Sequence, residues 1–257
     1  MRRIGVSKVV KNLRQNQIYE LLTQKDFVTV KELSDALFIS ESSVRRDLSE
    51  MERMHILKRS YGGARLISAK TNVVSFGARS YGSVDAKQAI AAKAARLVPE
   101  GSVVFLDQSS TCYFLAMELM KMHNLTVVSN NLEILSLLSR TELTVYATGG
   151  KISRENGNCL IGGSAQRAYS EIFADFMFFS ANAVSREGVI TDCTQEEIFV
   201  RHAMMKNAAR KIFLCDSSKL GATASFVQCD LGQVDVLVCE TDAFCETAKR
   251  YPGLQIL

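Results

Sequence analysis

Residues 39–48 read Ile-Ser-Glu-Ser-Ser-Val-Arg-Arg-Asp-Leu, and this stretch decides how the first part of the chain folds. Serine is favoured at the start of a helix, so Ser40 predicts a helix that runs from Glu41 to about Met54. Successive residues of a helix are rotated by about 100°, which divides this helix into two faces. The apolar face carries Val44, Leu48 and Met51, and the opposite face carries Ser42, Arg45, Arg46 and Ser49.

Two further apolar stripes at helical spacing precede this helix. The nearer stripe consists of Val30, Leu33 and Leu37, and the earlier one of Ile18, Leu21 and Leu22. A tight turn at Phe38-Ile39 joins the last two helices, so the three helices together predict a helix-turn-helix. In this arrangement the final helix buries its apolar face and turns its arginines and hydroxyls outward.

The outward groups are those that a reader of the DNA major groove needs. Arginine can donate two parallel hydrogen bonds to guanine or phosphate, and serine can donate to a phosphate or a base edge. The alternative is a solvated helix face with an ordinary charge pair. Residues 56–66 favour DNA binding, because two β-like runs around Gly62-Gly63 predict a basic hairpin. Such a hairpin after a recognition helix is a wing that contacts phosphates or the minor groove.

Positive charge gathers in the same part of the chain. Residues 1–64 hold 12 Lys and Arg against 8 Asp and Glu, whereas residues 65–257 hold 19 of each. The whole net charge of +4 therefore lies where phosphate binding requires it. The predicted DNA-binding residues are Thr29, Ser40, Ser42, Ser43, Arg45, Arg46, Ser49, Lys58, Arg59, Tyr61 and Gly62.

This region resembles the winged helix-turn-helix of the DeoR family of bacterial transcription regulators. The resemblance rests on Leu33 to Leu37, Ile39-Ser40, Ser43 to Leu48, Met51-Glu52 and Tyr61 to Ala64. The family usually has Thr-Ile where this chain has Ser43-Val44, and His where it has Tyr61. These departures leave the Arg45-Arg46-Asp47 centre of the motif intact.

The rest of the chain predicts an α/β domain. Short apolar runs alternate with helical segments, which is typical of a mostly parallel sheet covered by helices on both faces. The predicted strands are 103–106, 125–128, 143–147, 176–180, 211–215 and 234–239, and the predicted helices are 88–98, 112–122, 132–139, 165–173, 196–209 and 243–250. We place the winged helix-turn-helix at residues 1–66, a linker at 67–84, and the α/β effector-sensing and oligomerisation domain at 85–257.

Polar residues follow these strands, at the ends where open α/β sheets bind ligands. Ser109 to Thr111 would begin a helix, and free N–H groups there form an anion cradle opposite Lys219. Asp107, Asn130 and Asp192 would hold the polar groups of a bound anionic metabolite. The alternative at each loop is ordinary turn and capping chemistry. The predicted effector-binding residues are Asp107, Ser109, Ser110, Thr111, Asn130, Gly149, Gly150, Asp192, Glu196 and Lys219.

These loops resemble the DeoR C-terminal sensor domain, whose fold is similar to that of sugar-phosphate isomerases. The matching stretches are 105–107, 110–111, 125–130, 148–150, 160–162, 188–191, 196–197 and 216–219. The resemblance implies a regulator, most often a repressor of a carbohydrate or related operon, whose DNA binding a phosphorylated sugar modulates. The family often has glycine at Ser109 and lysine where Arg201-His202 stand, which favours a different effector or a different pose.

An enzyme with a DNA-binding head is the alternative function. A sugar-phosphate isomerase or deaminase needs a carboxylate or histidine near the reacting carbon, and Asp107, Asp192, Glu196 and His202 are candidates by position. No nucleophile–base pair stands out, so we predict no catalytic residues. A third reading is a DNA-binding oligomer whose ligand pocket is vestigial.

The composition bounds the remaining partners. The seven cysteines form no Cys-x-x-Cys pair and the three histidines are scattered, so we predict neither a metal site nor a cofactor. An odd cysteine count, with no secretory segment and no membrane-spanning run, fits reduced thiols in the cytoplasm. Specific DNA binding by so small a unit favours two half-sites, so we expect a homo-oligomer, either dimer or tetramer. The expected partners are operator DNA and a small anionic metabolite.

Overall fold

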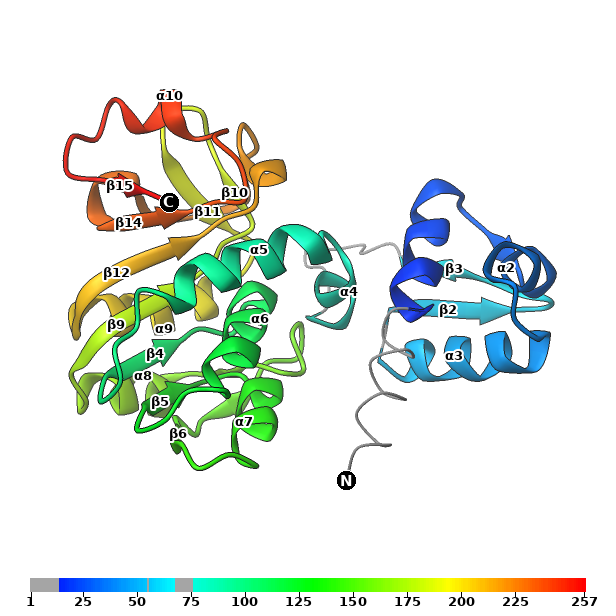
Figure 1. The fold of residues 1–257 in the computed structure, drawn as a ribbon, viewed down its shortest axis with the longest axis horizontal. Coiled ribbons are helices and arrows are strands. Elements are labelled where there is room, and N and C mark those ends of the chain that lie inside the picture. Colours follow the sequence, from blue (N-terminus) through cyan, green and yellow to red (C-terminus); the bar gives the residue numbers. More distant parts are fainter. Residues whose placement is uncertain (1–13, 55, 68–75) are drawn as a thin grey trace. The chain divides into compact units, whose positions relative to one another are not determined.

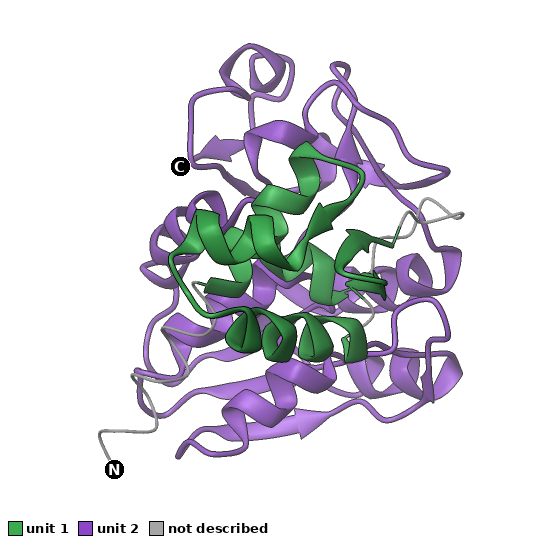
Figure 2. Ribbon diagram, turned by 90° about the vertical axis from the view of Figure 1, so that its right-hand side faces the viewer, with its two compact units in different colours: residues 1–82 green, residues 83–257 purple. Residues whose placement is uncertain are grey.

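The computed structural model of the chain describes residues 14–54, 56–67 and 76–257. The chain divides into two compact units, residues 1–82 and residues 83–257, which Figure 2 shows in separate colours. The α/β class predicted from the sequence is confirmed. Within the described residues, no helix is both long enough and apolar enough to cross a membrane.

The first unit combines short helices with a small antiparallel sheet (Figure 1). Its described part begins with a helix at residues 14–24. The following elements are β1 (Val28–Thr29), α2 (Val30–Leu37), α3 (Glu41–Arg53), β2 (Leu57–Ser60), β3 (Gly63–Leu66) and α4 (Phe76–Tyr81). The sheet has the strand order β1-β3-β2, so the hairpin predicted around Gly62-Gly63 is formed by β2 and β3.

The three predicted apolar stripes form the core of this unit. Five side chains from these stripes are at most 1% exposed, namely Ile18, Leu33, Val44, Leu48 and Met51. Burying an aliphatic side chain of this size stabilises a fold by roughly 1.5–3 kcal/mol relative to its exposure. The helix-turn-helix therefore holds together through the faces that the sequence pattern predicts.

Helix α4 lies within the predicted linker, residues 67–84, of which 68–75 are outside the described residues. Its Ala78 belongs to the apolar core of the first unit, and the Tyr81 hydroxyl donates to Gln15 Oε1 at 2.8 Å. The segment is only six residues long and rich in small residues, so it has no helical period that the sequence could reveal. The later part of the interval thus packs as part of the first unit.

Seven parallel strands form the central sheet of the second unit (Figure 1). In spatial order they are β15 (Gln255–Ile256), β14 (Val236–Val238), β12 (Ala208–Leu214), β9 (Ala174–Phe179), β4 (Val103–Leu106), β5 (Thr126–Ser129) and β6 (Thr144–Ala147). The chain first lays down β4, β5 and β6 toward one edge. It then returns and lays down β9, β12, β14 and β15 toward the other edge, so the strand order reverses between β4 and β9.

Helices cover both faces of this sheet, as predicted. One apolar core involves α5 (Val84–Ala95), α6 (Ser110–Leu119) and α7 (Leu132–Leu138), and the other involves α8 (Gly163–Ser170) and α9 (Gln195–Lys206). Alternate residues of a strand point to opposite faces. In β9, Phe176 and Phe178 accordingly enter the first core, whereas Met177 and Phe179 enter the second.

Two smaller antiparallel sheets were absent from the sequence prediction. One contains β10 (Ala183–Val184), β11 (Val189–Asp192) and β13 (Phe226–Asp230), and the other contains β7 (Lys151–Ile152) and β8 (Leu160–Ile161). Most of these strands are too short to show a period, and β13 pairs with β11 although α9 and β12 lie between them in the sequence. They place Asp192 and Gln228 beside the main sheet, where both residues join the site described below.

Candidate functional site

Helix α3 presents hydroxyl groups at its N-terminus. Ser40 is the N-cap, and its Oγ accepts a hydrogen bond from the Ser43 backbone N–H at 3.3 Å. The hydroxyls of Ser42 and Ser43 each lie 3.0 Å from Ser40 Oγ. The predicted serines therefore form one cluster, at the helix end whose dipole favours a phosphate.

The two arginines of α3 point away from the core of the first unit. Arg45 and Arg46 are exposed, and Arg45 Nη2 donates to Glu41 Oε2 at 2.6 Å on the surface. Asp47, the next residue, is fully buried and accepts a hydrogen bond from Arg14 Nη2 at 3.0 Å. Hydrogen bonding to Asp47 raises the pKa of Arg14. The Arg45-Arg46-Asp47 motif thus combines two outward cations with one structural anion.

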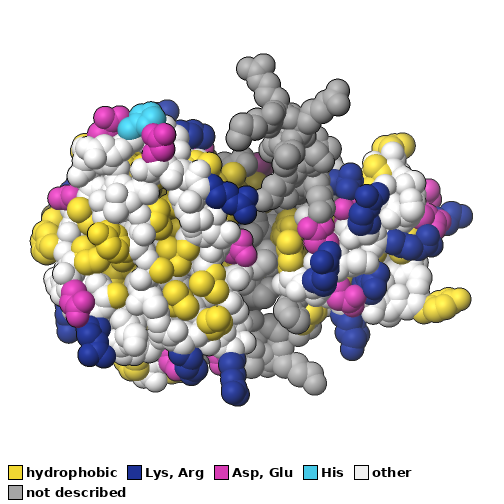
Figure 3. Space-filling model, turned by 90° about the horizontal axis from the view of Figure 1, so that it is seen from below, with side chains coloured by type: hydrophobic (Ala, Val, Ile, Leu, Met, Phe, Trp, Pro, Cys, Tyr) yellow, Lys and Arg dark blue, Asp and Glu magenta, His cyan; other side chains and the backbone are white. Residues whose placement is uncertain are grey.

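The wing residues divide into anchored and free groups. Arg59 Nε donates to Glu52 Oε2 at 2.8 Å and its Nη1 donates to Ser49 Oγ at 2.6 Å, which ties β2 to α3. Tyr61 is fully exposed at the tip of the hairpin, and Gly62 has a φ of 79° in open space. Lys58 is also exposed, and Lys and Arg side chains gather on the first unit, the smaller part on the right of Figure 3.

Thr29 has a structural task at the start of α2. Its Oγ1 accepts from the Glu32 backbone N–H at 3.1 Å, and Glu32 Oε2 accepts from the Thr29 backbone N–H at 2.8 Å. This capping box, together with Lys25, lowers the pKa of Glu32 to about 2. The hydroxyl of Thr29 is therefore engaged within the fold.

In the second unit, the polar residues converge at the carboxyl ends of β4 and β9. These two neighbouring strands flank the point where the strand order reverses, and ligands of open α/β sheets bind at such points. Asp107 follows β4 directly, and its carboxylate accepts from the backbone N–H groups of Ser109 at 2.9 Å and Ser180 at 3.3 Å. The Asp107 side chain thus links the two strand ends.

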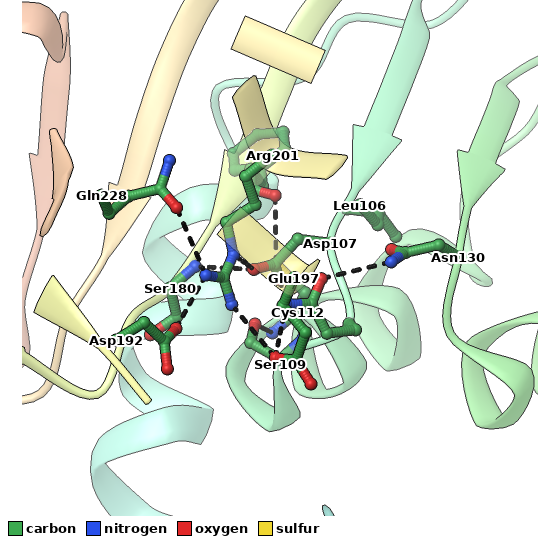
Figure 4. A network of polar contacts seen from close by, with 12 residues as sticks. Leu106, Asp107, Ser109, Cys112, Asn130, Ser180, Asp192, Glu197, Arg201 and Gln228 are labelled. Carbon is green, nitrogen blue, oxygen red and sulfur yellow. Dashed lines mark hydrogen bonds and ion pairs between the residues drawn. The ribbon is translucent and has the colours of Figure 1, made fainter. Parts of the chain in front are cut away.

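Arg201 is fully buried at the centre of this region (Figure 4). Its Nε donates to Asp107 Oδ2 at 2.8 Å, and its Nη1 donates to Asp192 Oδ2 at 2.7 Å. Glu197 Oε2 lies 3.8 Å from Nη2, and Gln228 Oε1 lies 3.5 Å from Nη1. Burial lowers the pKa of Arg201, but the charges of the three carboxylates, led by Asp192, raise it overall, well above its usual range. The guanidinium stays charged and holds three acidic side chains together.

The network continues through amide side chains toward β5. Gln108 Nε2 donates to Glu197 Oε2 at 2.9 Å, and Asn130 Nδ2 donates to Gln108 Oε1 at 3.3 Å. Tyr169 in turn donates its hydroxyl to Asn130 Oδ1 at 3.3 Å. Asn156 Nδ2 donates to Glu197 Oε1 at 3.2 Å, whereas its buried Oδ1 has no partner within the described residues. Asn130 is thus fully occupied in supporting the site.

The N-terminus of α6 lies beside this network. Ser109 is its N-cap and accepts from the Cys112 backbone N–H at 3.1 Å. Ser110 and Thr111 are buried in the first turn, and Thr111 Oγ1 has no hydrogen-bond partner in the part of the chain that the structure describes. A buried hydroxyl without a partner is unfavourable, so a bound group that reached it would be stabilised.

Lys219 lies at the end of the next strand, in the short helical turn Ser217–Lys219 that follows β12. Its Nζ donates to Ser180 Oγ at 2.9 Å and lies 3.4 Å from Asp216 Oδ2. Burial alone would raise the pKa of Asp216, but the positive charges of Lys219 and of the buried Lys87 lower it overall. Two lysines therefore flank this carboxylate at the carboxyl edge of the sheet.

Three of the predicted residues lie outside this network. Gly150 has a φ of 112°, and a Cβ there would lie 2.6 Å from the Ile161 carbonyl oxygen, so close packing accounts for the glycine. Gly149 is exposed with open space around it. The Glu196 side chain is exposed and pairs with Lys151 at 3.3 Å.

Of the two adjacent glutamates at the start of α9, the sequence analysis named Glu196 as an effector-binding residue, whereas the buried network contains Glu197. Glu197 is buried and bonded to Gln108, whereas Glu196 faces solvent. The sequence analysis noted Arg201 as a departure from the family but did not include it among the predicted effector-binding residues, although the spacing of four residues between Glu197 and Arg201 would have placed both on one helix face. The spacing of buried residues along α9 was the signal that could have found them.

Three of the four candidate catalytic groups are engaged within the fold, and the fourth, Glu196, is exposed. Asp107 and Asp192 pair with Arg201, and His202 Nε2 donates to the Gln228 carbonyl oxygen at 2.7 Å. Among the described residues, no group of three or more His, Cys, Asp or Glu side chains is arranged to hold a metal ion, and all seven cysteines are free thiols.

Comparison with known proteins agrees with this division into a DNA-binding unit and a ligand-binding unit. Residues 14–70 match the DeoR-like helix-turn-helix domain, and residues 83–241 match the DeoR C terminal sensor domain. The chain is 33% identical to the HTH-type transcriptional regulator GolR of Listeria innocua, over 88% of this chain and 89% of that protein. The chain therefore belongs to the DeoR family of DNA-binding transcription regulators.

Two further relatives cover almost the whole chain. The glycerol-3-phosphate regulon repressor of Escherichia coli is 28% identical over 90% of both chains, and the lactose phosphotransferase system repressor of Staphylococcus aureus is 30% identical over 94% of this chain and 97% of its own length. Among solved structures, ribose 5-phosphate isomerase A from Methanocaldococcus jannaschii aligns with 53% of this chain and 54% of its own, at 20% identity and a TM-score of 0.41.

Proposed function

We propose that this DeoR-family protein is a cytoplasmic repressor of a carbohydrate or related metabolic operon, which a phosphorylated sugar releases from its operator. The names of its relatives support this proposal, since two of them are repressors of a glycerol-3-phosphate regulon and of a lactose phosphotransferase system. The family resemblance implies that the ligand weakens DNA binding and does not act as a coactivator. Only a ligand with different affinities for two states of the protein can change its DNA affinity.

The partnerless Thr111 hydroxyl at the N-terminus of α6 is the observation that carries the proposal. The N-terminus of a helix offers backbone N–H groups and a positive dipole end to an anion. Lys219 and Lys87 supply full positive charges at the same edge of the sheet. The phosphate would thus bind to Ser110 and Thr111 at the N-terminus of α6, and the positive charges of the two lysines would neutralise its negative charge.

The buried network would support the proposed phosphate site without taking part in a reaction. A general base must accept a proton near neutral pH, and a carboxylate bonded to a guanidinium is a poor candidate. Asp107 and Asp192 both pair with Arg201, so we propose that they position the strand ends and that the protein is not an enzyme.

We also propose that the protein acts as a homo-oligomer. A single α3 helix reaches few base pairs, and repressors of this type gain specificity by binding two half-sites about one helical turn apart. Residues 83–257 hold 16 Lys and Arg against 19 Asp and Glu, and with this small net charge of −3 the second unit could supply the interface without strong repulsion between copies.

Lys219→Ala is the variant that tests the effector site. The protein would be titrated onto a duplex selected by the wild type, and sugar phosphates and their unphosphorylated sugars would then be added while fluorescence anisotropy is followed. Lys219→Ala should bind the duplex normally yet need at least about tenfold more sugar phosphate for release, which corresponds to about 1.4 kcal/mol. Lys121→Ala is the matched control, since Lys121 pairs with Glu118 at the opposite end of α6. Release of Lys219→Ala at the wild-type concentration would place the phosphate elsewhere.

A further inference from the structure

The turn between α2 and α3 holds an aromatic residue in an unusual backbone conformation. Phe38 has a φ of 53° and a ψ of 42°, which is the left-handed region. Ser34 stabilises the turn, because its carbonyl oxygen accepts hydrogen bonds from the backbone N–H groups of Phe38 and Ile39. The Ser34 hydroxyl also donates to the Ile39 carbonyl oxygen at 2.5 Å.

The fold of the first unit does not account for a phenylalanine at this position. Glycine and asparagine adopt the left-handed conformation most readily, and they are the usual residues after the end of a helix. A bulky side chain there is unfavourable. Burial brings no compensation, because the side chain of Phe38 is 94% exposed, whereas its neighbours Leu37 and Ile39 pack against the core. A strained and exposed aromatic residue points to a partner outside the unit.

The position of Phe38 indicates which partner that is. It stands two residues before Ser40, the N-cap of α3, at the same end of the helix as the serine hydroxyl cluster. Recognition helices of this motif contact base edges with their N-terminal residues. A phenyl ring can form no ordinary hydrogen bond, and the apolar feature that the major groove offers is the C5-methyl group of thymine.

We propose that Phe38 is a DNA-contacting residue that packs its ring against a thymine methyl group at the edge of the half-site read by α3. This assignment deepens the DNA-binding function of the protein and concerns no effector. The exposed ring would be desolvated only in the complex, so its contribution appears in DNA affinity and not in the stability of the free protein.

The first test compares Phe38→Gly with the wild type. Glycine suits the left-handed turn, so the variant should unfold at the same temperature as the wild type or higher. Its affinity for a duplex selected in vitro by the wild-type full chain should fall by roughly 5- to 100-fold at fixed salt. Asparagine also tolerates the left-handed conformation, so Phe38→Asn should show the same stability and the same loss of DNA affinity as Phe38→Gly. Phe173→Ala, which alters an exposed aromatic residue of the second unit, is the matched control and should bind like the wild type.

The second test removes only the methyl group from the DNA. Each thymine of the selected duplex is replaced singly by uracil, and the affinity of each duplex is measured. One replacement per half-site should weaken wild-type binding several-fold, by about the contribution of one buried methyl group, and leave Phe38→Gly unaffected. Equal binding by the wild type and Phe38→Gly, or equal sensitivity of both to every uracil, would overturn the assignment. So would a loss of self-association by Phe38→Gly in sedimentation, since the ring would then contact another copy of the chain. Because no effector is added, these outcomes are separate from the release experiment.

Discussion

Replacing Arg201 by methionine tests the central claim about the second unit. The Arg201 side chain is 1% exposed, and it hydrogen-bonds directly to Asp107 and Asp192 with Glu197 close by. Methionine fills a similar space but leaves these carboxylates buried without a positive partner. Removing one member of a buried ion pair costs about 3–5 kcal/mol, and because two direct partners are lost we expect about 4–5 kcal/mol here.

Urea denaturation of the full chain gives this free energy of unfolding. The chain has no tryptophan, so far-UV circular dichroism is the suitable signal. Arg140→Met, at an exposed position of the same unit, is the control and should change stability by no more than about 0.5 kcal/mol.

A double variant separates the ion-pair network from simple loss of packing. If the cost arises from unpaired carboxylates, adding Asp107→Asn to Arg201→Met should recover part of the lost stability. The reasoning is refuted if Arg201→Met costs less than about 1 kcal/mol, or if the two substitutions destabilise additively.

Three other expectations concern the surface and assembly of the protein. Arg46→Ala should weaken operator binding by about 1–3 kcal/mol without lowering the melting temperature, because Arg46 is exposed; unchanged affinity at fixed salt would remove it from the interface. Folding lowers the pKa of Glu32 from 4.5 to about 2, so the ionised side chain should stabilise the first unit fully above pH 4.5 and lose this effect as the pH falls toward 2. The difference in melting temperature between the wild type and Glu32→Gln should therefore disappear over that interval. Sedimentation at micromolar concentration should detect dimers or tetramers, and a lone monomer would contradict the half-site argument.

Helices and strands could be predicted from the sequence where the spacing of apolar residues indicates a buried face. Val44, Leu48 and Met51 repeat at helical spacing and are buried, so the position of α3 and its outward arginines could be predicted. Strand β4 was predicted for a similar reason, since a short apolar run between turn residues is typical of a parallel strand covered on both faces. The apolar pattern alone carries this information.

The buried polar network around Arg201 could not be predicted in the same way. Arginine is rarely buried in full, so nothing in the composition of α9 favoured Arg201 as an interior residue. Its partners come from β4, β11 and β13, which meet only in the folded chain. The pairing of β11 with β13 depends on contacts between distant residues, and so Asp192 and Gln228 entered the site from strands that no local period reveals.

The reversal of strand order between β4 and β9 has a consequence for synthesis of the protein on the ribosome. The first unit can fold once Gly82 has emerged from the ribosome, and β4 to β6 can pair after they have emerged in turn. Asp107, however, must wait for β9 to arrive at its side and for Arg201 to neutralise its charge. In a nascent chain the DNA-binding unit therefore emerges before the sensor domain, and it would have neither the sensor nor the proposed oligomer interface until the second unit had folded.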